Sequence, residues 1–129
     1  MIDTVVYDLL KNISEVQTHI DDRIYPGVVP EKCKEPSIRY VIEDEPDELT
    51  GFGTSGYYKS DIQIDIYHEK YSLARLIARA ILKRLHGFQQ VDADIPVSLI
   101  EHLDTKMFYE KKSREHRALM TFTIQYKET

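Results

Sequence analysis

Apolar residues near the start of the chain recur at intervals that fit a helix. They begin at Ile2, end at Ile13 and leave the intervening polar residues on the other side, which predicts an amphipathic helix. The apolar stripe consists of Ile2, Val5, Val6, Leu9, Leu10 and Ile13. A short second helical segment is predicted over 14–20. The stretch DRIYPGVVP (22–30) then ends the helical pattern with its two prolines, and we interpret it as a corner that sets the helices against a sheet.

Strict alternation of apolar and polar residues marks the strands. It predicts strands over 37–45 and 57–69, with Ile62, Ile64 and Ile66 on one face of the second. Two more alternating segments predict strands from about 97 to 110 and over 116–127, and the polar sequence KKSRE between them suits a hairpin turn. The 12 residues from 45 to 56 contain three glycines and one proline without periodicity, so we expect a loop that is mobile in the isolated protein.

The strongest helical pattern lies between the second and third predicted strands. Ser72 is the expected N-terminal cap, and Gly87 is the expected C-terminal cap. Its apolar stripe consists of Leu73, Leu76, Ile77, Ala80, Ile81 and Leu85. The order of elements predicts a single α+β domain over 1–129, in which helices cover one face of a mostly antiparallel four-stranded sheet with exposed edge strands.

Composition narrows the range of functions. The chain of 129 residues carries 17 basic and 22 acidic residues, and its net charge of -5 lacks the basic balance of a protein that grips nucleic acid. A single cysteine rules out an internal disulfide and a multi-cysteine zinc site. No apolar run approaches the ~20 residues of a membrane span. Because nucleophile, metal-ligand and phosphate-binding motifs are absent, we predict no cofactor and no enzyme activity.

One cluster nevertheless offers groups that a metal-dependent nuclease would use. Asp61, Asp65, His68 and Glu69 provide three carboxylates and an imidazole within nine residues. The alternation of a strand places Asp61 and Asp65 on one face, with His68 on the other, so the four side chains converge poorly. We therefore expect an acidic sheet face turned to solvent or to a lumen, and keep the metal site as an alternative.

Two groups of like charge are candidate interaction surfaces. The basic ridge recurs at helical spacing and consists of Arg75, Arg79, Lys83 and His86. The acidic block follows the first predicted strand and consists of Glu43, Asp44, Glu45, Asp47 and Glu48. Either group alone suits a solvated surface. Unlike patches on one protomer can also meet on neighbouring copies, which is the head-to-tail contact that builds closed rings.

Several stretches together resemble a known family. They are DRIYPGVVP, the strand SIRYVI, the strand-to-helix junction YYKSDIQIDIYHEKYSLA, the helix end LHGF and the final strand LMTFTIQYK. Over nearly the whole chain, from about Val5 to Tyr126, this order is similar to the tail-completion or tail-terminator (tail-to-head joining) proteins of long-tailed bacteriophages and prophages.

The resemblance implies a non-enzymatic component of the virion. Such a protein forms a homohexameric ring that caps the head-proximal end of the tail tube, after assembly in the host cytoplasm. Its implied partners are other copies, the tail tube protein and a head connector or neck protein, while DNA passes through the bore without specific binding. In that setting Asp61 and Asp65 would face the lumen, and the loop over 45–56 would contact a neighbour or the tail tube. A head-completion neck protein of the same particle is the alternative.

Overall fold

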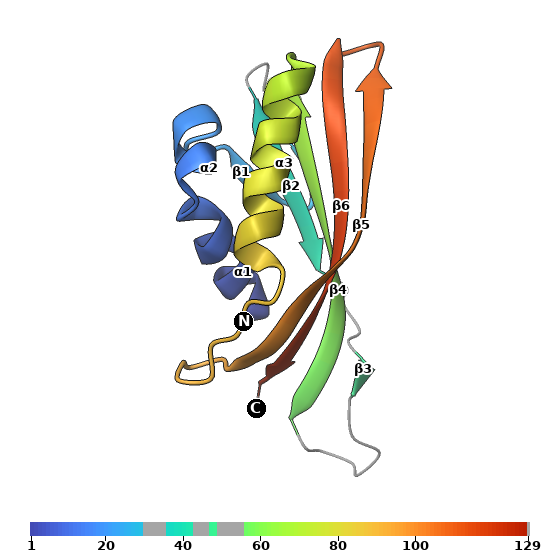
Figure 1. The fold of residues 1–129 in the computed structure, drawn as a ribbon. Coiled ribbons are helices and arrows are strands. Elements are labelled where there is room, and N and C mark those ends of the chain that lie inside the picture. Colours follow the sequence, from blue (N-terminus) through green and yellow to red (C-terminus); the bar gives the residue numbers. More distant parts are fainter. Residues whose placement is uncertain (30–35, 43–46, 49–55, 129) are drawn as a thin grey trace.

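The computed structural model describes residues 1–29, 36–42, 47–48 and 56–128. They form two layers, with three helices packed on one face of a long twisted sheet (Figure 1). The α+β class predicted from the sequence is confirmed. Three acidic residues of the acidic block, Glu43, Asp44 and Glu45, lie outside the described residues, as does most of the loop expected over 45–56.

The first two helices form where the apolar spacing predicts them. Helix α1 spans Ile2–Lys11 and helix α2 spans Ser14–His19. They bury the apolar stripe against the sheet, so that Val6, Leu10 and Val16 have no exposed surface. No helix in the described part of the chain is long and apolar enough to cross a membrane.

Helix α3, Tyr71–Leu85, differs from the prediction in two details. Its N-terminal cap is Lys70, so the prediction of Ser72 as the cap is wrong. Leu76, predicted within the apolar stripe, is 44% exposed. The buried face is centred on Ile77 and Ile81, and a residue next to Ile77 in sequence points about 100° away from it. At the other end Gly87 adopts the left-handed conformation expected after a helix, with a φ of 80°.

The sheet has one more strand along its main path than the four predicted. Its order is β1-β2-β4-β6-β5, and the two-residue strand β3 pairs separately with β4. The strands are β1 Ile24–Pro26, β2 Ser37–Ile42, β3 Asp47–Glu48, β4 Tyr57–His68, β5 Val97–Glu110 and β6 Glu115–Lys127. All pairs are antiparallel except β1 with β2. The prediction of a mostly antiparallel sheet is therefore confirmed, and the number of strands is corrected.

The additional strand β1 lies inside DRIYPGVVP, for which the sequence predicts only a corner. Ile24 pairs with Ile38 and Pro26 with Tyr40, so the segment first adds an edge strand and turns only at Gly27, whose φ is 79°. Proline is tolerated there because an edge strand need not donate on both sides. The guanidinium of Arg23 donates to the carbonyl oxygens of His19 and Pro36, which ties the end of α2 to the start of β2.

The core lies between the helices and one face of β4 and β6. Ile62, Ile64 and Ile66 point to the helices, and the facing residues of β6 are also buried: Ala118, Met120, Phe122, Ile124 and Tyr126. His68 shares this face and accepts a hydrogen bond at Nδ1 from the backbone N–H of Lys70 at 3.0 Å. Burial lowers the pKa of His68, and the nearby His19 lowers it further. The opposite face of the sheet carries no helix (Figure 1).

Candidate functional site

The helix-free face of the sheet has a buried carboxylate at its centre. Asp65 of β4 has no exposed surface. It lies between Arg39 of β2, which is its partner in the strand register, and Arg117 of β6, which is a near neighbour. Arg39 donates from Nε at 2.9 Å and from Nη2 at 2.6 Å to Oδ2. Arg117 donates from Nε to Oδ1 at 3.0 Å, and its Nη2 lies 2.9 Å from the same oxygen. The amide of Gln63 donates to Oδ2 at 3.0 Å, so both carboxylate oxygens are satisfied.

Two aromatic side chains lie beside this network. The guanidinium of Arg117 lies 5.9 Å from the ring centre of Tyr67 and 6.0 Å from that of Phe108. Burial raises the pKa of Tyr67, and the charge of Asp65 raises it further, although Arg117 and Arg39 oppose this. Tyr67 is therefore a neutral phenol at physiological pH. The network joins three strands and is suited to fixing their positions rather than to proton transfer.

The acidic face expected from the sequence is thus only partly present. Asp61 is exposed on the helix-free face, whereas the carboxylate of Asp65 is buried and neutralised by two arginines. Asp65 lies on the helix-free face and is paired there with both arginines, and its place at a lumen stays a prediction. Nor does the structure gather the four residues of the metal alternative, since His68 lies on the helix-covered face. Within the described ranges, no three potential ligands lie close enough to hold a metal ion.

The basic ridge borders a groove between α3 and β5. Its four side chains are all exposed. The groove is lined from α3 by Tyr71, Arg75, Ala78, Arg79 and Leu82, and from the sheet by His102, Thr105, Met107 and Met120. A second hollow continues it along the helix and is lined by Leu82, Lys83, His86 and His102. The floor is largely apolar, and neither lining contains a carboxylate, so the groove is a cationic surface with an apolar base.

Strand β5 forms the outer margin of this groove and is an edge of the sheet. The outer side of its first residues is occupied, because Gly87 donates to the carbonyl of Ile100 and Gln90 pairs with Val97. Beyond His102, whose N–H donates to Nδ1 of His86, the described residues provide no backbone partner on that side. Exposed apolar residues accompany this free edge: Leu103, Phe108 and Tyr109. Such an edge can receive a strand from another chain.

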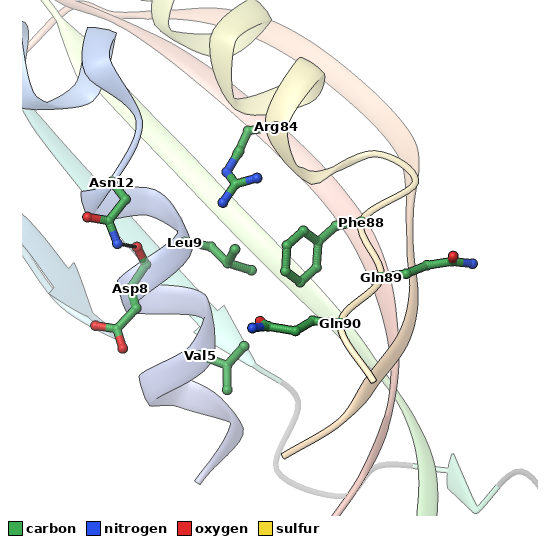
Figure 2. Close-up of a pocket in the computed structure, with 8 residues that line it drawn as sticks. All are labelled: Val5, Asp8, Leu9, Asn12, Arg84, Phe88, Gln89 and Gln90. Carbon is green, nitrogen blue, oxygen red and sulfur yellow. Dashed lines mark hydrogen bonds between the residues drawn. The ribbon is translucent and has the colours of Figure 1, made fainter. Parts of the chain in front are cut away.

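A third hollow lies where α1 meets the segment after α3 (Figure 2). Leu9 and Phe88 point into it, and the guanidinium of Arg84 lies 5.4 Å from the ring centre of Phe88. The carboxylate of Asp8 points away from Arg84. No nucleophile and base converge among the residues drawn.

Sequence reasoning missed the partners of Asp65 and the groove. Arg39 and Arg117 both occupy polar positions of alternating strands, which is a detectable signal. Their approach to Asp65 depends on strand register across separations of 26 and 52 residues. The basic ridge was visible in the sequence, but its position beside the edge strand was not.

Comparisons with known proteins bear on the whole chain. The fold is similar to a chain in a solved structure described as the virion of native gene transfer agent (GTA) particle, with a TM-score of 0.72 and 17% sequence identity. That match covers 95% of this chain and 92% of the other. A search of curated proteins gives no match. The family model described as Tail completion protein gp17 matches residues 4–127. The family resemblance expected from the sequence is confirmed: the chain belongs to the Tail completion protein gp17 family of phage structural assembly proteins.

Proposed function

We propose that this protein is a non-enzymatic virion protein that forms a homohexameric ring, caps the head-proximal end of the tail tube and joins the tail to the head. Membership of the tail completion family supports the role in tail assembly. The proposed partners are identical copies, the tail tube protein and a head connector or neck protein. The protein assembles in the host cytoplasm and resides at the head-tail junction, where DNA passes through the ring without specific binding.

The observation that best supports a ring is the surface formed by α3 and β5 on one side of the protomer. A cationic groove and a free strand edge lie together on one side of the protomer. The cationic groove is not self-complementary, because two copies of it repel each other. A partner of different character must therefore occupy the groove. If every copy offers such a partner surface elsewhere, contacts run head to tail and close into a ring. The acidic residues Glu43, Asp44 and Glu45 remain one proposed partner surface for the basic ridge.

The helix-free face of the sheet is the proposed lining of the bore. Asp61 is exposed on this face and supplies a negative charge that would weakly repel DNA. Asp65 has a different role there, since its pairing with Arg39 and Arg117 keeps the strands of the lining in register. Because these ion pairs join neighbouring strands, the lining keeps its shape while DNA slides past. Both arginines are paired with Asp65, so neither presents an unpaired positive charge to the DNA.

Charge reversal of the basic ridge should prevent ring formation. In the variant R79E/K83E, two exposed cations beside the groove become acidic, so a partner surface selected for cations is repelled. We expect the parent protein to form particles with the mass of six 15.1 kDa chains, and the variant to stay monomeric. Size-exclusion chromatography with light scattering, with and without the tail tube protein, measures both masses.

The matched control is Lys11→Glu, which reverses an exposed cation on α1 that does not line the groove. It should form rings as the parent does, and all three proteins should keep the same Tm because each change lies on the surface. Normal rings from a folded R79E/K83E protein would remove the basic ridge from the subunit interface. A parent protein that stays monomeric even with tail tube protein would contradict the proposed ring.

A further inference from the structure

An exposed acidic loop precedes the edge strand. The 91–95 loop consists of Val91, Asp92, Ala93, Asp94 and Ile95. Its first four residues are exposed, with Val91 at 71% and both carboxylates in solvent. In the part of the chain that the structure describes, neither Asp92 nor Asp94 takes part in an ion pair. An exposed valine beside two unpaired carboxylates matches the character that the groove requires of a partner: negative charge together with an apolar side chain.

The groove offers the complementary surface with a similar spacing. Arg75 and Arg79 are four residues apart on α3, which places them about 6 Å apart along the helix axis. Asp92 and Asp94 are two residues apart in a segment that bends over 92–95, so they lie closer together than the ~7 Å of an extended strand. Two carboxylates on the loop can therefore face two guanidinium groups on one turn of the helix. Met107 and Leu82 on the floor and wall provide apolar contacts for Val91.

The loop and the cations of the groove lie at different heights along α3. Figure 1 shows the segment after α3, which contains the 91–95 loop, projecting past the C-terminal end of the helix before it enters β5. Arg79 lies six residues before that end, about 9 Å along the helix axis, and Arg75 lies one turn further back. The loop and the two arginines are therefore apart within one chain. Between copies, a contact that joins two different patches is head to tail, and repetition of it either closes a ring or extends a filament.

We propose that the 91–95 loop of one protomer docks into the α3–β5 groove of the next copy, with Asp92 and Asp94 paired to Arg75 and Arg79. This inference rests on the proposed ring and names the surfaces that build it. The contact is electrostatic at its rim and apolar at its base, so it weakens as salt rises. The free edge of β5 lies beside the docked loop and supplies backbone donors and acceptors to it.

A charge swap tests the pairing directly. D92K/D94K and R75E/R79E should each raise the protein concentration needed for half-maximal ring formation about tenfold or more, because attraction becomes repulsion. Combining all four substitutions restores opposite charges in exchanged positions and should return that concentration close to the parent value. Native mass spectrometry over a dilution series measures it. The control Asp22→Lys reverses an exposed carboxylate outside the loop and should assemble normally.

Proximity cross-linking provides an independent measurement that keeps every charge. In a chain with Cys33→Ser, one variant carries Ala93→Cys in the loop and a second carries Thr105→Cys in the groove; both native residues are exposed. A short bismaleimide should link the two variants when they are mixed, and should link neither variant to itself. Two results would overturn the pairing while leaving the ring intact. The first is that rings form without this mixed product. The second is that the fourfold charge variant needs as high a protein concentration for ring formation as the double variants do. Absence of rings from the parent protein even when tail tube protein is present would overturn the proposed function as well.

Discussion

Asp65→Ala is expected to lower the free energy of unfolding by about 2–4 kcal/mol, because it leaves two arginines without their shared carboxylate. Asp65 has no exposed surface, and the side chains of Arg39 and Arg117 are only 26% and 23% exposed. Removal of a buried ion-pair partner typically costs somewhat more, but water can reach part of both guanidinium groups and limits the loss. Urea denaturation followed by circular dichroism measures the change.

Asp61→Ala is the matched control for this experiment. Asp61 lies on the same strand and the same face, but it is exposed. Its replacement should change the free energy of unfolding by no more than about 0.5 kcal/mol. Equal effects of the two substitutions would contradict the structural role of Asp65. A thermal shift on addition of Mg²⁺ or Mn²⁺ that disappears in Asp65→Ala would support the metal site that the structure does not assemble.

Phe122→Ala should lower the free energy of unfolding by about 3–5 kcal/mol, since it opens a cavity in the middle of β6. Phe122 is fully buried and faces the helix layer, and the ring of His102 lies 5.3 Å from it in an edge-on arrangement. The same denaturation experiment measures the loss. Thr121→Ala, at the next position and on the other face, is the control and should have a much smaller effect. A small effect of Phe122→Ala would mean that the core between α3 and β6 is not packed as described.

Periodicity predicted the helices and the long strands because their buried faces repeat over several turns or pleats. It missed β1, since three residues contain too little alternation to distinguish a strand from a turn. It also assigned Leu76 to the core, because apolar character alone does not separate the two margins of a helical stripe. The cap at Lys70 carries no capping side chain, so no sequence signal marks it.

The candidate site shows a sharper limit. Alternation correctly placed Asp61 and Asp65 on the same face of the strand, but Asp61 is exposed and Asp65 is buried. The difference arises from strand register, which sets Arg39 opposite Asp65 and brings Arg117 close to it. Such pairings link distant parts of the chain, and one sequence does not specify them. The groove beside the basic ridge likewise depends on how α3 lies across the sheet.

Electron microscopy of tail tubes tests the central claim most directly. Tail tube protein is polymerised with and without this protein, and the ends of the tubes are imaged. The proposed function predicts a six-fold ring at one end of each tube and an arrest of growth at that end, with R79E/K83E failing to cap. Tubes that grow equally with and without the folded parent protein, and carry no ring at either end, would contradict the assignment as a ring that terminates the tail.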